Sequence, residues 1–308
     1  MPTLGAVHLL SPVADALRDG RPVVALESSV LAQGLPEPAN ARAFERMTRA
    51  VERAGGTPAV AAIVRGRAQF GLDGDDLARF LARTGVHKAG ARDLGVLAAL
   101  GADGATTVSA TLAMAGLAGI DVFATGGIGG VHHEPDYDES ADLVELARTS
   151  CVVVCAGAKS ILDLPATLER LDTLGVAVVG YRCDELPGFF TAHTDLPLPW
   201  RLETAEAIAE AFLAQRALGR PGALLVVQPP PAEVALPRDV VDRAVRAAHT
   251  QARIRGVRGG GVTPFMLAAV EKETEGRSLN TNLALLDANA ALAGAIAGAL
   301  AVRRVTSA

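Results

Sequence analysis

The sequence predicts a single-domain α/β protein with three layers, α/β/α, around a parallel or mixed central sheet. The first observation behind this prediction is that short runs rich in Val and Ala alternate with helix-period segments almost from end to end. The second is composition: of 308 residues 50% are hydrophobic but only 4% aromatic, so a sizeable core must be built from small aliphatic side chains. No change of composition marks a boundary, so residues 1–308 are expected to form one domain.

The expected strands are continuous apolar runs, a pattern typical of strands that are buried on both faces of a sheet. They span, in chain order, residues 22–28, 59–64, 121–125, 151–156, 176–180 and 223–227. The helix-period segments span residues 40–54, 75–83, 141–148, 204–218, 239–255, 263–275 and 281–301. This alternation predicts helices on both faces of the sheet but does not give the order of the strands.

Charge and hydropathy argue against a nucleic-acid polymer or a membrane as partner. The net charge of −5 and the isoelectric point near 5.7 give no global basic field, although a small anionic ligand needs only local donors. The stretch 283–302 is apolar but contains Asp287 and Asn289 and is otherwise mainly Ala and Gly. A buried helix is therefore favoured over a membrane span.

Cysteine usage and the first residues indicate a cytoplasmic protein. The three cysteines form no C-x-x-C pair, which favours reduced thiols. Residues 1–11 lack the basic and apolar regions of a secretion signal.

Lysine is rare, and its positions are informative. Arginine supplies 26 of the 29 basic side chains, and the three lysines are Lys88, Lys159 and Lys272. Lys272 lies between two glutamates and is expected at the surface, whereas Lys88 and Lys159 end apolar segments. A lysine in an apolar setting can lose its proton and form a Schiff base, or bind a phosphate as a compact charge. The alternative is that both are ordinary strand-end lysines that reach solvent.

Two glycine-rich turns resemble nucleotide-binding loops without matching their motifs. The run 157–160, G-A-K-S, lacks two glycines of the P-loop pattern. The run 126–130, G-G-I-G-G, misses G-x-G-x-x-G because His132 occupies the last glycine position. A glycine-rich turn directly after a strand can bring backbone N–H groups to an anion, but a flexible loop tip fits the pattern equally well.

The segment 131–142 gathers two histidines and five carboxylates before an expected helix. Oxygen-rich clusters of this kind suit Mg²⁺ or Mn²⁺, usually with several waters retained. The alternative is an acidic surface loop in which Ser140 caps the helix.

Glu27 follows four apolar residues at the end of the first expected strand. Burial there would desolvate its side chain, and a desolvated carboxylic acid can act as a general acid near neutrality. A salt-bridge partner is the competing interpretation. In open α/β sheets, however, ligands gather at the carboxyl ends of strands, where Glu27, the glycine run and Lys159 all fall.

The same segments resemble the pseudouridine-5′-phosphate glycosidase family, whose members include indigoidine-synthase-A-like proteins. The similarity runs over nearly the whole chain, and its two most specific strings are F-A-T-G-G-I-G-G-V-H and C-A-G-A-K-S-I-L-D-L. The matching segments are 24–28, 88–94, 104–108, 122–132, 155–164, 263–265 and 278–282.

The resemblance implies reversible cleavage of pseudouridine 5′-phosphate to uracil and ribose 5-phosphate, assisted by Mn²⁺, in a homotrimer. Matched position by position, it makes Glu27 the proton donor and Lys159 the imine-forming nucleophile. It makes Asp138 the metal ligand. The positions that it implies for substrate binding are Lys88, Val108, Ser140, Ala141, Asp142 and Asn282.

The chain departs from the family pattern at two places. The segment between His132 and Asp138 is shorter than in the family and has a different amino-acid sequence. Asp136 is therefore a second candidate for the metal ligand. Residues 259–261 carry no charge where the family often has one.

The chemistry that the resemblance implies explains why a lysine is needed. Uracil is joined to ribose through carbon in pseudouridine, so the leaving atom has no lone pair to protonate, unlike that of an ordinary glycoside. Attack by a neutral Lys159 on the sugar, with Glu27 handling the proton, would divide the cleavage into easier covalent steps. A Schiff-base aldolase of a sugar phosphate and a non-catalytic nucleotide-binding protein are the alternative functions.

Overall fold

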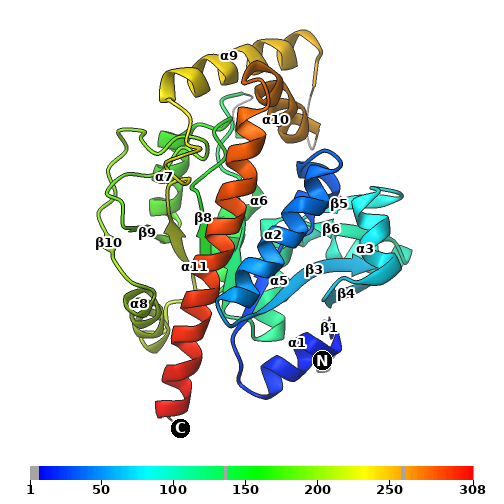
Figure 1. The fold of residues 1–308 in the computed structure, drawn as a ribbon, viewed down its shortest axis with the longest axis vertical. Helices are drawn as coiled ribbons and strands as arrows, with labels where there is room; N and C mark the ends of the chain where they lie inside the picture. Colours follow the sequence, from blue (N-terminus) through cyan, green and yellow to red (C-terminus); the bar gives the residue numbers. More distant parts are fainter. Residues whose placement is uncertain (1–6, 135–136, 258–260, 308) are drawn as a thin grey trace.

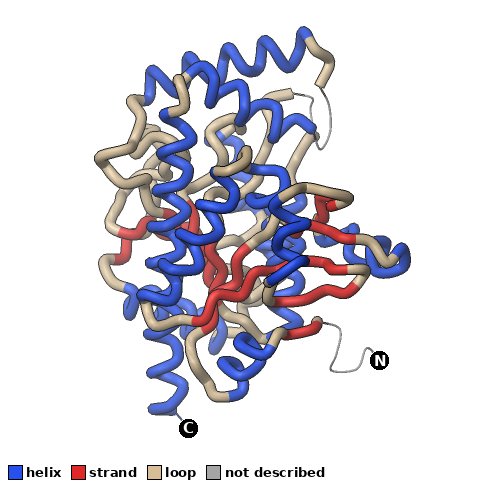
Figure 2. Tube along the Cα trace, turned by 45° about the vertical axis from the view of Figure 1, so that its right-hand side comes forward, coloured by secondary structure: helices blue, strands red, loops and turns tan. Residues whose placement is uncertain are grey.

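The computed structural model describes residues 7–134, 137–257 and 261–307. Within this part of the chain, a mixed sheet of eleven strands lies between two layers of helices (Figures 1 and 2). Its main path runs β1-β4-β3-β2-β7-β8-β11-β9-β10, and β5 and β6 form a branch that joins through β3. The predicted three-layer α/β/α fold is confirmed, and of the two predicted kinds of sheet, parallel or mixed, it is the mixed one that forms.

The strands are short, and those at the centre are apolar throughout, as expected for a sheet covered on both faces. Their bounds are β1 His8–Leu9, β2 Val23–Leu26, β3 Thr57–Val64, β4 Arg67–Phe70, β5 Val86–Ala89, β6 Asp103–Thr106, β7 Val122–Ala124, β8 Val152–Cys155, β9 Ala177–Tyr181, β10 Arg201–Leu202 and β11 Leu224–Val227. Among the described strands, the pairs β3–β4 and β3–β6 are antiparallel and the other pairs are parallel. Strands β2, β7 and β8 are neighbours, so their carboxyl ends meet at one edge.

Helices cover both faces of the sheet. Their bounds are α1 Ser11–Arg18, α2 Ala39–Arg53, α3 Gly74–Leu81, α4 Leu94–Leu100, α5 Val108–Ala118, α6 Ala141–Arg148, α7 Leu164–Thr173, α8 Ala205–Ala217, α9 Arg238–Ile254, α10 Val262–Glu273 and α11 Arg277–Ser307. A π-helical turn, η1 (Val30–Gly34), follows β2, and a 3₁₀ turn, η2 (Ala91–Asp93), follows β5. Helices α2 and α11 pack together across one face, whereas α5, α6 and α7 lie on the other (Figure 1).

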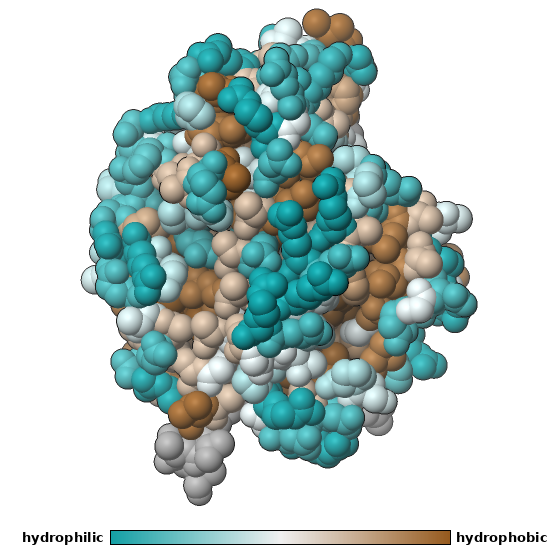
Figure 3. Space-filling model, viewed as in Figure 1, coloured by the Kyte–Doolittle hydropathy of each residue, from teal (hydrophilic) through white to brown (hydrophobic). Residues whose placement is uncertain are grey.

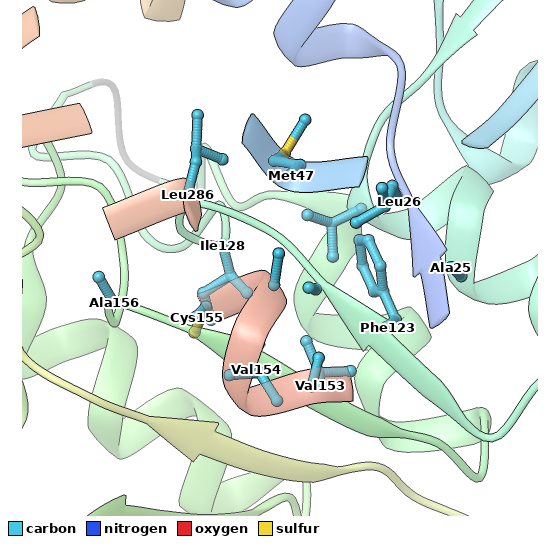
Figure 4. Packing of buried hydrophobic residues seen from close by; sticks show 14 of the residues in the cluster. Ala25, Leu26, Met47, Phe123, Ile128, Val153, Val154, Cys155, Ala156 and Leu286 are labelled. Atoms are coloured by element: carbon cyan, nitrogen blue, oxygen red, sulfur yellow. The ribbon is translucent and has the colours of Figure 1, made fainter. Parts of the chain in front are cut away.

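The core consists mainly of aliphatic side chains between the sheet and the helix pair α2 and α11. Figure 4 shows Met47 and Leu286 of these helices beside Leu26, Phe123 and Val153 of the central strands. All five are buried. Burial of each large side chain contributes roughly 1.5–3 kcal/mol. The opposite side of α2 carries exposed charged residues and appears hydrophilic in Figure 3.

Helix α11 is the apolar stretch that the sequence assigned to the core rather than to a membrane. By length and composition Arg277–Arg303 could span a bilayer, but more than half of its most apolar window is buried against the rest of the protein. A Cβ atom added at Gly294 would lie 2.6 Å from the Cβ of Ala54. Glycine at this position therefore lets α11 approach the end of α2 closely.

The predicted strands and helices are present with bounds correct to within two residues, except that α11 extends further at both ends. The elements that were not predicted from the sequence are β1, β4, β5, β6, β10, α1, α4, α5 and α7. Helix α5 was missed because it is apolar on nearly every side, so it has no amphipathic period. Strands β5 and β6 were missed because they are short and carry polar residues.

Candidate active site

The carboxyl ends of β2, β7 and β8 bring together the three features that the sequence placed at strand ends. Glu27 directly follows β2, the glycine run 126–130 follows β7, and Lys159 lies four residues after β8. The register pairs Leu26 with Ala124, and Ala124 with Val154, so the three chain segments leave the sheet side by side. The predicted convergence is confirmed, at the edge where open α/β sheets bind ligands.

Glu27 is buried and held by two hydroxyl groups. Its Oε1 accepts a hydrogen bond from Thr125 and its Oε2 accepts one from Ser29. The turn that carries Thr125 is itself fixed, because Asn289 Nδ2 of α11 donates to the Thr125 carbonyl at 2.8 Å. A carboxyl group with both oxygens engaged keeps one orientation, which a proton donor requires.

Lys159 is tied to the glycine run by backbone and side-chain contacts. Its Nζ donates to the Gly127 carbonyl at 2.8 Å, and its backbone N–H donates to the Ile128 carbonyl at 3.1 Å. The side chain is half-buried. In the neutral amine, an N–H group can make the bond to Gly127 while the nitrogen lone pair stays available for attack on a carbon.

Lys88 shares the electrostatic environment of these groups. Burial lowers the pKa of the Lys88 amine, and the positive charge of Lys159 lowers it further, whereas Asp142 and Glu27 act in the opposite direction. The residue is nevertheless exposed to solvent. A partly desolvated cation that solvent can still reach is suited to binding a phosphate brought from solution.

Asp142 connects the glycine run to the start of α5. Its Oδ1 accepts from the Ser109 N–H at 2.9 Å and its Oδ2 accepts from the Gly129 N–H at 2.8 Å. Ser140 caps α6 by accepting from the Asp142 N–H at 3.2 Å, so the predicted helix cap is present. Asp142 is thus buried with both oxygens engaged by the backbone.

Val108, Ala141 and Asn282 contribute in different ways. The Val108 side chain is buried at the N-terminus of α5, so only its backbone could meet an anion there. Ala141 is exposed at the first position of α6. Asn282 of α11 lies against Gly126 and lines a cavity of about 170 Å³ together with Gln33 and other residues.

Asp138 is the described candidate for a metal ligand. It is half-buried, and its negative charge favours the protonated form of the neighbouring His132. The second candidate, Asp136, lies outside the described residues, as do Gly259 and Gly260. No group of three or more potential ligands forms among residues 7–134, 137–257 and 261–307. This donor set fits a hard ion that keeps most of its waters, such as Mn²⁺ or Mg²⁺, and does not fit a fully protein-ligated centre.

His132 was predicted only as a member of the histidine and carboxylate cluster 131–142, and the structure places it in the electrostatic environment of the site. Burial lowers the pKa of its imidazole, the charges of His133, Lys159 and Lys88 lower it further, and Asp138 opposes them. The ring is therefore neutral at neutral pH and can accept or donate a proton within the electrostatic reach of both lysines. Thr125, Ser29 and Asn289 were not predicted as part of the site. The position of His132 at the end of the glycine run was a signal in the sequence for His132 alone.

The glycine run leaves no room for a side chain at Gly129. An added Cβ would approach the Ser140 hydroxyl and would lie 2.6 Å from Ser140 Cβ and 2.8 Å from Asp142 Oδ2. We expect Gly129→Ala to destabilise the fold by roughly 1–3 kcal/mol, as overpacking does, and to reduce activity. Urea denaturation measures the first effect. Gly95→Ala is the control, because nothing lies within 4 Å of the added carbon, and equal stability of the two variants would contradict the prediction.

Comparison with known proteins identifies the family. The model of the family described as "Indigoidine synthase A like protein" matches residues 12–299. The chain belongs to this family. A pseudouridine-5′-phosphate glycosidase of Gemmatimonas aurantiaca is 62% identical over 290 residues, which cover 94% of this chain and 95% of that relative. One of Herpetosiphon aurantiacus is 48% identical, with 95% and 97% covered.

Two solved structures have the same fold as this chain. The prealnumycin C-glycosynthase AlnA, in complex with ribulose 5-phosphate, superposes with a TM-score of 0.89 at 36% identity and covers 97% of this chain and 98% of its own. An indigoidine synthase A-like protein of Thermotoga maritima gives 0.88 at 34% identity, with 98% of each chain covered. The family resemblance predicted from the strings around Thr125 and Lys159 is therefore confirmed.

Proposed function

We propose that the protein cleaves pseudouridine 5′-phosphate reversibly to uracil and ribose 5-phosphate through an imine between Lys159 and the ring-opened sugar. The observation that carries the proposal is that Lys159, after β8, and the hydrogen-bonded Glu27, after β2, lie at the carboxyl ends of two strands that both pair with β7, with Lys88 in the same electrostatic environment. The names of the relatives support it, as does the ribulose 5-phosphate complex of AlnA, since that ligand is a sugar phosphate.

The first covalent step opens the sugar ring. The neutral amine of Lys159 attacks C1′, the C1′–O4′ bond breaks, and Glu27 gives its proton to O4′. The new secondary ammonium then gives a proton to the Glu27 carboxylate, which restores the carboxylic acid. Gly127 accepts from Nζ in the free protein and would keep the amine near the end of β8 until substrate arrives. Lys88 and the backbone at the start of α5 would bind the 5′-phosphate.

The second step releases the base. A proton is added to C5 of uracil, the nitrogen lone pair forms the C1′=N bond, and the electrons of the C1′–C5 bond restore the C5=C6 double bond. Water then hydrolyses the imine, which frees ribose 5-phosphate and regenerates Lys159. Neutral His132, whose pKa the charges of Lys159 and Lys88 lower, is suited to moving protons during these steps.

We further propose that Asp138 holds a Mn²⁺ ion that retains most of its waters. When bound, the ion would supply ordered, polarised water next to the base. Removal of metal with EDTA should lower uracil release, and added Mn²⁺ should restore it. Asp138→Asn should weaken Mn²⁺ binding measured by calorimetry by at least about tenfold. Unchanged affinity in this variant would contradict the assignment of Asp138.

The reaction itself is tested by incubating the purified protein with pseudouridine 5′-phosphate and Mn²⁺ and separating the products by chromatography. Uracil and ribose 5-phosphate should form in equal amounts. A folded, metal-loaded protein that releases no uracil would contradict the glycosidase and favour a sugar-phosphate aldolase or a non-catalytic binding protein. A homotrimer in the cytoplasm remains a prediction from the family, and sedimentation would test the trimer.

A further inference from the structure

Helix α9 carries a histidine that contacts the site from outside it. The helix lies across one end of the molecule and packs against α10 (Figure 1). His249 Nε2 lies 3.1 Å from the carbonyl oxygen of Ile161. Ile161 is buried two residues after Lys159, and the Leu162 N–H closes the intervening turn by donating to the Lys159 carbonyl at 3.0 Å. His249 of α9 therefore contacts the turn of residues 159–162, which carries Lys159.

The same imidazole ring contacts the segment after the glycine run. The rings of His249 and His133 meet edge to face, with centroids 5.2 Å apart and planes at 79°. His133 Nδ1 lies 3.6 Å from Asp163 Oδ2, and the Asp163 N–H donates to the Val131 carbonyl at 2.9 Å. One side chain on α9 thus touches both the segment around Lys159 and the segment around His132.

The protonation state of His249 agrees with a donor role towards Ile161. Burial lowers the pKa of the ring, and the charges of His133 and His132 lower it further, whereas the Ile161 carbonyl and Glu134 oppose this. The ring is therefore neutral at neutral pH, and only its Nε2–H tautomer can donate to the Ile161 carbonyl, which lies next to Nε2.

We propose that His249 is a positioning residue for Lys159, and that it acts through the Ile161 carbonyl rather than on the substrate. This inference rests on the proposed imine chemistry. If the Nε2–H donor is lost, the turn of residues 159–162 can relax, and a shift of about 1 Å at a reacting group can cost up to about a hundredfold in rate. Substrate binding through Lys88 and the start of α5 should change little, because both lie outside the turn of residues 159–162 that His249 contacts.

Three substitutions separate the donor from the ring. His249→Phe keeps a ring against His133 but has no donor, so kcat should fall by about ten- to a hundredfold with KM nearly unchanged. His249→Gln places an amide donor near the former Nε2 and should retain most of kcat. His249→Ala, which loses both features, should be at least as impaired as His249→Phe. Thr250→Ala is the control on the same helix, because its hydroxyl donates to the Arg246 carbonyl within α9.

The experiment measures uracil release and, separately, the rate at which borohydride traps ribose 5-phosphate on each variant. Slower trapping in His249→Phe, with recovery in His249→Gln, supports the proposal. A general loss of stability would not depend on whether the side chain at position 249 carries an N–H donor. His249→Phe with wild-type kcat and trapping rate overturns it, and so does equal impairment of the Gln and Phe variants. A wild-type protein that releases no uracil would instead overturn the proposed function, so the two failures are distinguishable.

Discussion

Lys159→Arg should abolish turnover of pseudouridine 5′-phosphate while the fold persists. Arginine stays protonated, so it has no lone pair with which to attack C1′ or to expel uracil. It keeps the positive charge beside Lys88 and His132 and can still donate to the Gly127 carbonyl. We expect kcat to fall by more than about 10⁴-fold, as for removal of other covalent nucleophiles.

The measurement is uracil release at saturating substrate, with thermal unfolding and circular dichroism as checks of the fold. Lys272→Arg is the matched control, because Lys272 lies in the last turn of α10 between two glutamates and outside the site. It should have wild-type activity. Activity of Lys159→Arg within about tenfold of the wild type would exclude the imine mechanism.

Glu27→Gln should produce the second largest loss, about 10²–10⁴-fold in kcat, the usual contribution of general acid–base catalysis. The amide occupies the same volume and can still hydrogen-bond the hydroxyls of Ser29 and Thr125, but it cannot give a proton to O4′. Because the fold is preserved, stability should change far less than activity does.

Two measurements make this prediction specific. Glu45→Gln on the exposed side of α2 should leave kcat unchanged and serves as the control. Ribose 5-phosphate exists partly as an open-chain aldehyde, which can form the imine with Lys159 without the ring-opening step that needs Glu27. Borohydride should therefore still trap ribose 5-phosphate on Lys159 in the Glu27→Gln variant. Wild-type kcat in the Glu27→Gln variant would contradict the assignment of Glu27 as the proton donor.

The central sheet could be predicted because its strands are unambiguous in the sequence. Runs such as Val152–Cys155 are apolar at every position, and only a strand covered on both faces requires this at so short a length. Helix α5 could not be predicted in the same way, because residues buried on all sides have no period that marks a helix. The antiparallel pairing of β3 with β4 and β6 also leaves no mark that hydrophobic pattern alone can reveal.

The site could be predicted where it depends on strand ends and not where it depends on side-chain contacts. Glu27 and Lys159 each follow an apolar strand, so the rule that ligands gather at carboxyl ends was enough to bring them together. Thr125 and Asn289, which fix Glu27 and its neighbouring turn, come from segments far away in the chain. His249 lies in an ordinary amphipathic helix, and only the folded chain brings it to Ile161.

The most direct test of the account is to map the imine. The wild-type protein is incubated with ribose 5-phosphate, reduced with borohydride and digested, and the modified lysine is located by mass spectrometry. The account predicts a reduced pentose phosphate adduct on Lys159 in the wild type and no adduct in Lys159→Arg. An adduct on Lys88 or Lys272, or no adduct in a protein that releases uracil, would contradict it.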